Sequence, residues 1–213
     1  MARARRGVHP KRLLPRQESP GELPSVERVT RNWTDGNTAN MSIGQDPILV
    51  TPLQIAVMTS AVANGGKVFW PRLADRFEAQ DPMPGERPLR FPKAQLRDEL
   101  GVSARTLAVL HEAMLADVED PDATGRRAAI PGLRVCGKTG TAQVKNVQGQ
   151  KTGQITWFAS FAPYGSPRYA VVVMVEDGVS GGETCAPIAA KVYTAILQAE
   201  GKASGPTVAA ATR

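Results

Sequence analysis

The segment Lys138-Thr139-Gly140-Thr141 lies at the end of an apolar stretch and is followed by two strand-like runs and a helix. A Lys, two hydroxyl side chains and a Gly on one edge strand can hold a carboxylate and let a substrate backbone come close, which is half of an acyl-transfer site. The other half would be a Ser followed three positions later by Lys, and this pair occurs nowhere in the sequence. The segment therefore predicts a recognition strand without its nucleophile.

The composition favours one domain with a neutral body. The chain has 213 residues, of which 42% are hydrophobic, and this is enough for one sizeable core. The net charge of +6 comes from residues 1–16, which hold six of the 26 basic residues and no acid, so the remaining 20 basic residues balance the 20 acidic ones. We therefore expect a basic, disordered tail over residues 1–16 and no nucleic-acid partner.

The sequence indicates no targeting segment, disulfide framework or metal site. No stretch approaches the roughly 20 apolar residues of a membrane span, and the N-terminal residues lack the apolar run of a signal peptide. Cys136 and Cys185 are too few for a disulfide framework, and His9 and His111 offer no metal-ligand spacing. Both cysteines are predicted to be small, buried, apolar residues.

Two helices are predicted in the first part of the chain, after an irregular stretch over residues 17–50. The first begins at Thr51, where a Gln three positions on completes a capping box, and ends at Asn64-Gly65-Gly66. The second begins near Ser103, after a charged excursion over residues 74–102. The side chains predicted to face the core are Ile55, Met58 and Val62 in the first helix and Leu107, Leu110, Met114 and Val118 in the second.

From about Leu133 the pattern becomes strand-like. Residues 133–144 are predicted to form one strand, residues 144–153 a polar hairpin loop, and residues 169–175 a strand buried on both faces. Between them Ile155, Trp157, Ala159 and Phe161 alternate on a further strand. A last helix is expected over residues 184–198, with a disordered tail over residues 200–213. Its inward-facing residues are predicted to be Ile188, Val192, Ala195 and Ile196.

Several motifs, in order, resemble the C-terminal part of a class B penicillin-binding protein transpeptidase domain. They are Ser42-Ile43-Gly44-Gln45, Thr51-Pro52-Leu53-Gln54, Ala63-Asn64-Gly65-Gly66, Gly137-Lys138-Thr139-Gly140-Thr141-Ala142-Gln143, Trp157-Phe158, Ala162-Pro163, Gly181-Gly182 and Ala186-Pro187. Asp35-Gly36-Asn37-Thr38 adds a resemblance to the elongation-type members, and the likeness runs from about Glu18 to Leu197. The resemblance implies an α/β fold, the penicillin-recognising serine transpeptidase or β-lactamase-like fold, with antiparallel sheet strands and covering helices.

The resemblance also implies roles for four residues. Lys138 resembles the family's active-site Lys on the edge strand and is the candidate catalytic residue. The candidate substrate-binding residues are Thr139, Gly140 and Thr141. The two hydroxyls match those that hold the carboxylate of the substrate or of a β-lactam, and Gly140 leaves room for the acyl chain. The backbone N–H of Thr141 would be one of two oxyanion donors. No metal or organic cofactor is implied.

The activity implied is peptidoglycan D,D-transpeptidation, which cross-links the cell wall through an acyl-enzyme on a Ser. In the family the Ser-x-x-Lys and Ser-x-Asn motifs lie upstream, and Thr38-Ala39-Asn40 is a likeness to the second motif in the wrong segment. We therefore expect residues 17–199 to be an incomplete transpeptidase domain, inactive alone. Its expected partners are the upstream half and, once completed, a peptidoglycan stem peptide or a β-lactam. The family acts at the outer face of the bacterial inner membrane.

The resemblance predicts an exposed sheet edge. In the family, strands from the upstream sequence pair beside the strand that resembles residues 169–176. Two positions depart from the family pattern: Asp46 stands where Gly is usual, which puts the local backbone angle in question, and Cys136 stands where Ala is usual.

Three alternatives stay open at this point. Residues 132–139 also match the phosphate-binding pattern of P-loop NTPases, but that site needs a strand before Gly132 and a helix opening at Lys138, and the flanking residues favour neither. A second Lys-Thr-Gly, residues 151–153, falls in the predicted polar loop and indicates ordinary turn chemistry. Finally, the chain could be a non-catalytic interaction module or remnant.

Overall fold

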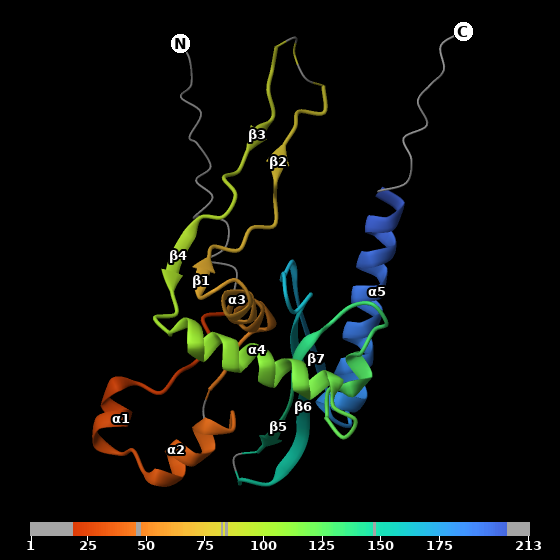
Figure 1. The fold of residues 1–213 in the computed structure, drawn as a ribbon. Helices are drawn as coiled ribbons and strands as arrows, with labels where there is room; N and C mark the ends of the chain where they lie inside the picture. The colour runs from red at the N-terminus through yellow and green to blue at the C-terminus, as the bar shows by residue number, and fades with distance from the viewer. Residues whose placement is uncertain (1–18, 46–47, 82, 84, 147, 204–213) are drawn as a thin grey trace, which may run out of the picture.

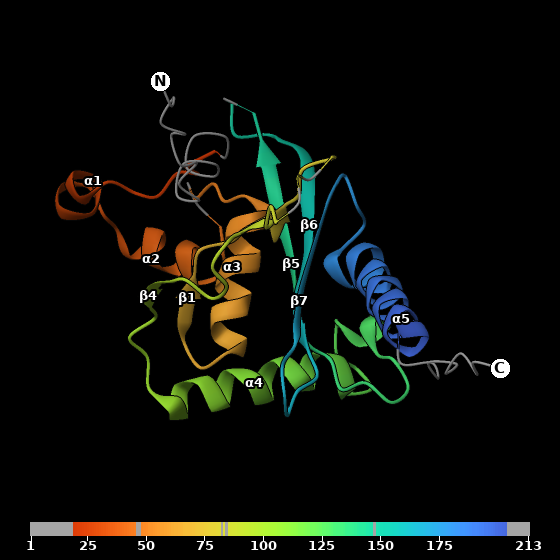
Figure 2. The ribbon, with the colours of Figure 1, turned by 90° about the horizontal axis from the view of Figure 1, so that it is seen from above.

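The computed structural model describes residues 19–45, 48–81, 83, 85–146 and 148–203. Its centre is a three-stranded antiparallel sheet in the order β5 (Cys136–Lys145), β6 (Lys151–Ala162), β7 (Tyr169–Glu176). Helix α5 (Ala186–Ala203) covers one face of this sheet, and α3 (Pro52–Ala63) and α4 (Ala104–Glu119) cover the other (Figures 1 and 2). The predicted α/β fold with an antiparallel sheet is confirmed.

The predicted starts of α3 and α4 are correct because both carry side-chain caps. The Oγ1 of Thr51 accepts a hydrogen bond from the N–H of Gln54 at 3.2 Å, and the Gln54 side chain accepts one from the N–H of Thr51 at 2.9 Å. This is the capping box that the sequence indicated. The Oγ of Ser103 caps α4 by accepting from the N–H of Thr106 at 3.1 Å.

Residues 17–50 are less irregular than predicted. Two short helices, α1 (Val26–Arg31) and α2 (Asp35–Ser42), lie there, capped by Ser25 and Thr34. Neither helix buries a residue, and both lie at the lower left of Figure 1, apart from the central sheet. The prediction failed because caps alone specify these helices, with no apolar periodicity to mark them.

The charged excursion over residues 74–102 contains short strands outside the central sheet. Strand β1 (Lys67–Phe69) pairs with β4 (Leu96–Glu99), and β2 (Arg76–Phe77) pairs with β3 (Leu89–Arg90). The second pair forms an arm that extends away from the body of the molecule (Figure 1). A 3-10 turn, η2 (Arg126–Ala128), follows α4.

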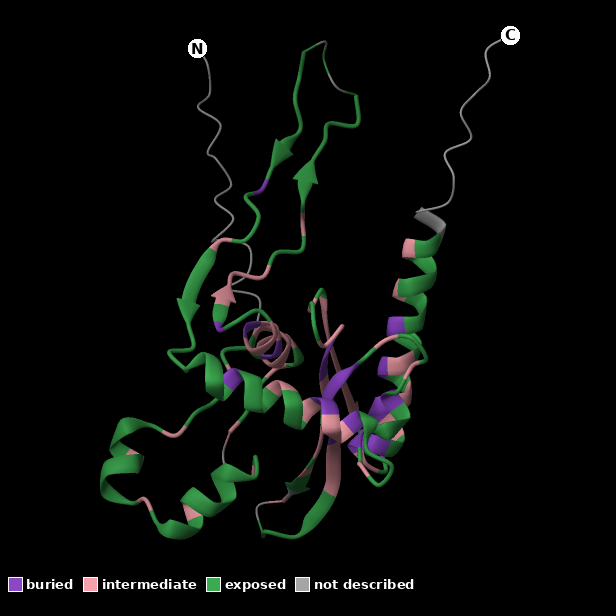
Figure 3. Ribbon diagram, in the orientation of Figure 1, coloured by how far each residue is buried: buried purple, intermediate pink, exposed green. Residues whose placement is uncertain are grey.

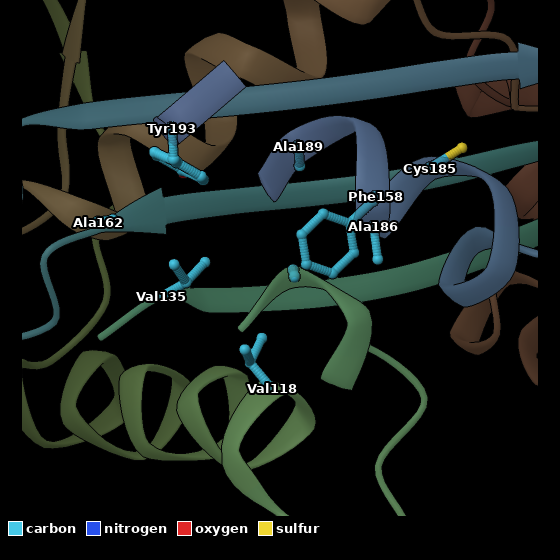
Figure 4. Close-up of a cluster of buried hydrophobic side chains, with 9 residues drawn as sticks. Val118, Val135, Phe158, Ala162, Cys185, Ala186, Ala189 and Tyr193 are labelled. Atoms are coloured by element: carbon cyan, nitrogen blue, oxygen red, sulfur yellow. The ribbon is translucent and has the colours of Figure 1, made fainter. Parts of the chain in front are cut away.

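Buried residues gather on β6 and along the inner face of α5 (Figure 3). The ring of Phe158 lies at the centre of the core on the α5 side (Figure 4). The cluster around it contains Val118, Ala128, Val135, Ala162, Cys185, Ala186, Ala189 and Tyr193. A smaller cluster on the other face joins Phe161 to Leu115 and Cys136. Both cysteines are buried and free, as predicted.

Burial along β6 agrees only in part with the predicted alternation. Of the alternating apolar residues, Phe161 is fully buried, whereas Ile155, Trp157 and Ala159 are only partly buried. On the other face Thr156 and Ser160 are fully buried beside Phe158. The buried hydroxyls are satisfied, because Thr156 donates to the carbonyl of Val175 at 2.9 Å and Ser160 donates to that of Val171 at 2.8 Å. The apolar alternation did not indicate these two buried residues, because strand carbonyls supply the acceptors that let polar side chains be buried there.

The inward face of α5 was also predicted wrongly, except for Ile196. Ile188 and Val192 are 38% and 39% exposed, and Ala195 is exposed as well. Small residues, Ala186 and Ala189, face the sheet instead and allow α5 to approach it closely. The helix is preceded by a π-helical turn, η3 (Gly181–Cys185).

The ends of the chain and the two earlier helices need further corrections. Helix α5 continues past Gln198 to Ala203, and Glu200 accepts hydrogen bonds from Arg168 and Tyr169, so the expected tail does not begin at residue 200. The remaining expected tails, residues 1–16 and 204–213, lie outside the described residues. In α3 Met58 is 48% exposed, and in α4 Leu110 is 41% exposed, contrary to their predicted inward positions.

Strand β7 is half-buried along seven of its residues, where burial on both faces was expected. Among the described residues, no strand pairs with the edge of β7 that faces away from β6. The run Val171 to Val175 therefore lies on an edge with no Lys or Pro inside it.

Alkaline pH is expected to destabilise the fold through Cys136 and Tyr193. Burial raises the pKa of each group to about 12, whereas their ordinary values are 9.0 and 10.0. Above about pH 9 the unfolded chain therefore releases protons that the folded chain still holds. The contribution of these two groups to the free energy of unfolding is complete below about pH 9 and is lost as the pH rises toward 12. Melting temperatures measured by circular dichroism between pH 8 and pH 11 should fall, and Cys136→Ala should make the fall shallower. An unchanged slope in that variant would contradict the assignment.

Candidate active site

The four predicted site residues lie in the middle of β5, at a sheet edge. Their partners on β6 are Ala159 for Lys138, Phe158 for Thr139, Trp157 for Gly140 and Thr156 for Thr141. Side chains alternate along a strand, so Thr139 and Thr141 lie on the face of the sheet that α5 covers, and Lys138 lies on the opposite face. The other long edge of β5 carries no strand among the described residues.

A cleft of about 780 Å³ opens beside this edge. Three of the predicted site residues, Thr139, Gly140 and Thr141, line it. The rest of the lining comes from the turn after α4 and from the start of η3, and it consists of Ala123, Thr124, Arg126, Arg127, Ser180, Gly181, Gly182 and Glu183. Lys138 does not line the cleft. Its Nζ donates to the backbone carbonyl of Thr139 at 2.9 Å and approaches the Oγ1 of Thr139 at 3.5 Å.

Two residues that the sequence did not indicate bind Thr139. Asp117 lies in the last turns of α4, and its Oδ2 accepts a hydrogen bond from the backbone N–H of Thr139 at 3.2 Å. The Oγ1 of Thr124 donates to the Oδ1 of Asp117 at 2.8 Å and lies 2.6 Å from the Oγ1 of Thr139. No local motif joins these three positions, so only the fold brings them together.

The motif residue Gln45 reaches the same edge. Its side-chain Nε2 donates to the backbone carbonyl of Thr141 at 3.3 Å, across 96 residues of sequence. Gly44, with φ +72, allows the turn that directs Gln45 to the strand. The departure at Asp46 lies outside the described residues. Both ends of the exposed edge are thus held by side chains, Asp117 at Thr139 and Gln45 at Thr141.

Two glycines let the η3 turn lie directly against the site. A Cβ added to Gly181 would lie 2.2 Å from the carbonyl oxygen of Trp157 and 2.8 Å from that of Gly140. A Cβ added to Gly182 would lie 2.1 Å from the carbonyl oxygen of Thr124. Because all of these obstacles are backbone atoms, no side chain can move aside, and only glycine is compatible with the wall of the cleft at both positions.

The charged groups on the cleft wall are mainly cationic. Arg126 and Arg127 both line it, and Arg127 is 3.7 Å from Glu183, the one carboxylate residue among the described residues of the lining. Arg126 also donates to the backbone carbonyl of Glu119 at 3.3 Å. Two hydroxyls, a nearby Lys ammonium and two guanidinium groups suit an anionic ligand such as a carboxylate.

The geometry excludes the P-loop alternative. Lys138 lies inside β5, where a phosphate-binding loop would need the start of a helix. The second Lys-Thr-Gly was predicted to lie in the hairpin loop, and this prediction is wrong. The segment forms the start of β6, so the loop is shorter than expected. The Nζ of Lys151 donates to Gln154 at 3.0 Å, and Lys151 does not line the cleft.

Comparisons with known proteins agree on one family. The model of the family described as penicillin binding protein transpeptidase domain matches residues 16–194. The chain is 33% identical over 191 residues to the peptidoglycan D,D-transpeptidase MrdA of Haemophilus influenzae, and the match covers 83% of this chain and 29% of MrdA. MrdA supports the resemblance to the elongation type.

Solved structures give the same result. The apo crystal structure of penicillin-binding protein 3 from Mycobacterium tuberculosis superposes with a TM-score of 0.70 and 29% identity, covering 86% of this chain and 42% of that one. Its complex with ampicillin also gives a TM-score of 0.70, at 28% identity and 89% and 43% coverage. The chain spans less than half the length of each of these relatives.

Two further features of the described residues concern membranes and metals. None of their helices combines the length and the apolar character that crossing a bilayer requires. Nor do they contain a group of three or more His, Cys, Asp or Glu side chains placed to hold a metal ion.

Proposed function

The chain belongs to the penicillin-binding protein transpeptidase domain family, and from this premise we propose that residues 17–199 form the carboxylate-recognition half of a D,D-transpeptidase active site. The reaction would cross-link peptidoglycan stem peptides, with a Ser nucleophile supplied by the upstream half of the domain. The observation that carries the proposal is the cleft beside β5. Thr139, Gly140 and Thr141 line this cleft, and Arg126 and Arg127 give its wall positive charge.

Each residue of the segment has a distinct part in this proposal. The ammonium of Lys138 attracts the substrate carboxylate and the hydroxyl network of the nucleophile. Thr139 and Thr141 place hydroxyls on the carboxylate side of the strand. Gly140 leaves the strand edge open to the acyl chain, and the N–H of Thr141 contributes to the oxyanion site. A β-lactam would occupy the same position.

The sheet edge supports a partner that completes the domain. The edge of β7 carries an apolar run with no strand beside it among the described residues, and α5 presents Ile188 and Val192 at 38% and 39% exposure on its outer face. Burying apolar surface of this kind stabilises an assembled domain by roughly 25 cal/mol per Å². The partner proposed for both surfaces is the upstream half of the transpeptidase domain. The completed enzyme would act at the outer face of the inner membrane, in the synthesis of the wall that sets cell shape.

The proposal is tested by non-covalent ligand binding to the 213-residue chain. Benzylpenicillin should bind weakly and saturably in a nuclear magnetic resonance titration, and its methyl ester, which lacks the carboxylate, should bind less well. Lys138→Met should weaken the binding of benzylpenicillin, and the matched variant Lys151→Met should not. Equal binding of the acid and the ester, or equal effects of the two variants, would overturn the proposed site.

A further inference from the structure

Two arginines line the cleft at positions outside the motif on β5. Arg126 and Arg127 lie in the 3-10 turn η2, directly after α4. Two contacts of the neighbouring residues hold this turn in place. Ala128 is fully buried in the core cluster on the α5 side, and the backbone N–H of Gly125 donates to the carbonyl of Asp117 at 2.9 Å. Both arginines are therefore carried on a turn whose backbone is fixed beside the cleft.

The residues of η3 show at which end of the cleft the arginines lie. A Cβ added to the first glycine of η3 would lie 2.8 Å from the carbonyl oxygen of Gly140, and one added to the second would lie 3.7 Å from the Cγ2 of Thr139. The third residue, Glu183, lies 3.7 Å from Arg127. Along η3 the contacts thus pass from Gly140 to Thr139 and then to Arg127. The arginines lie beyond Thr139, on the side away from Gly140.

The positive charge of the two guanidinium groups is only weakly neutralised. Arg126 donates to the backbone carbonyl of Glu119 at 3.3 Å, which is a neutral acceptor. The carboxylate of Glu119 binds Arg134 instead, with both contacts at 2.9 Å, and this bonding lowers the pKa of Glu119. Arg127 and Glu183 are too far apart for a hydrogen bond, and their side chains are 61% and 54% exposed. Such a surface pair contributes little, so Arg127 loses little when it binds a ligand.

The cleft has room for more than one anionic group. Its volume of about 780 Å³ lies within the range of about 300 to 1,000 Å³ that is usual for sites of drug-sized ligands. A single carboxylate held by Thr139 and Thr141 fills only a small part of it. The planar fork of a guanidinium group also suits a second planar anion, because it can donate two parallel hydrogen bonds.

We propose that Arg126 and Arg127 form a second anionic subsite, beyond Thr139, that favours ligands with two negative groups. The inference rests on the proposed function, in which Thr139 and Thr141 hold the first carboxylate. It narrows the ligand class to stem peptides or β-lactams that carry a second negative group on the carboxylate side. The acyl chain, which the proposed function places at Gly140, lies on the other side and does not reach this subsite.

The test compares two cephalosporins that differ in charge at one end. Ceftriaxone and cefotaxime share the acyl side chain and the ring carboxylate. The 3-substituent of ceftriaxone ends in an acidic triazine, whereas that of cefotaxime ends in a neutral acetate ester. Nuclear magnetic resonance titration of the 213-residue chain gives the ratio of the two dissociation constants. Replacing both arginines, by Arg126→Gln and Arg127→Gln together, should lower the preference for ceftriaxone about fivefold, the upper end for an exposed ion pair.

Two controls separate direct contact from a change in overall charge. Arg87→Gln with Arg90→Gln removes two exposed cations from the arm of β2 and β3 and should leave the ratio unchanged. Glu183→Gln removes the neighbour of Arg127 and should raise the preference for ceftriaxone. In an Arg127→Gln background this gain should disappear, because contacting groups are not additive. An equal loss from the arm variant, or a gain that persists without Arg127, would overturn the subsite.

A second pair of probes tests on which side the subsite lies. Carbenicillin differs from benzylpenicillin by one carboxylate on the acyl side chain. The ratio of their dissociation constants should be the same for the wild-type chain and for the variant that lacks both arginines. A loss of preference as large as that for the cephalosporin pair would overturn the placement of the subsite beyond Thr139.

A ligand fragment separates this inference from the proposed function. The probe is the free mercaptotriazine, which is the 3-substituent of ceftriaxone without the ring carboxylate. It should shift the side-chain Nε–H signals of Arg126 and Arg127, which the two single Gln variants assign. If both signals shift but cefotaxime binds no better than its methyl ester, the proposed function is wrong and the arginines still bind an anion. If cefotaxime binds through its carboxylate but neither signal responds to the fragment, the second subsite is wrong and the proposed function holds.

Discussion

Replacing Lys138 by Ala in the completed domain is expected to lower the rate of acylation by penicillin by about a hundredfold or more. The reason is that removing one preorganised electrostatic group from an acyl-transfer site commonly costs this much. The completed domain here means the chain joined to the proposed upstream half, which would carry Ser-x-x-Lys. The second-order rate constant for labelling by a fluorescent penicillin measures the effect.

The second Lys-Thr-Gly supplies a matched control. Lys151→Ala changes the same residue type at the start of β6, where the side chain binds Gln154 and lies off the cleft. Its acylation rate should stay close to that of the unmodified protein. Equal losses from the two replacements would show that the wrong Lys-Thr-Gly has been assigned to the site.

Phe158→Ala is expected to lower the free energy of unfolding by about 3 to 5 kcal/mol, the range for a large aromatic side chain in a packed core. Phe158 is fully buried at the centre of the cluster on the α5 side. Its ring lies over Gly137, where an added Cβ would be 2.2 Å from the Cζ of the ring. Urea unfolding, followed by circular dichroism, measures the change through the midpoint and slope.

The control for this variant is Phe77→Ala, in the arm formed by β2 and β3. Phe77 is 53% exposed and contacts Phe91 edge to face with ring centroids 5.3 Å apart. Its loss should cost no more than about 1 kcal/mol. A cost for Phe158→Ala as small as that for Phe77→Ala would mean that Phe158 is not the centre of the core.

Local signals in the sequence predicted local structure well. The capping box of Thr51 and Gln54 and the cap at Ser103 fixed the starts of α3 and α4, because both side chains bind within three residues. The three strands of the central sheet were also predicted in order, with the change to strand periodicity near Leu133. Burial faces were harder to predict. The inward residues of β6 include Thr156 and Ser160, whose partners are carbonyls on β7.

The candidate site was predictable only as far as its motif reached. The motif identified Lys138, Thr139, Gly140 and Thr141, and the fold placed the last three on one cleft. Asp117 and Thr124 were missed because their contacts to Thr139 span 22 and 15 residues and depend on how α4 packs against β5. Gly181 and Gly182 were part of the resemblance, but their reason, backbone contact with Trp157 and Thr124, appears only in three dimensions.

The most direct test of the account is covalent labelling by penicillin of the chain alone and of the chain mixed with the separately produced upstream half. We expect these residues to recognise the ligand and the nucleophile to lie elsewhere, since no Ser in the sequence is followed three positions later by Lys. The chain alone should therefore carry no label after denaturation. In the mixture, label should appear on the upstream half, and the amides of Val171 to Val175 should become protected from exchange. Label that remains on the chain alone after denaturation would contradict the account, because it would show a nucleophile within these 213 residues.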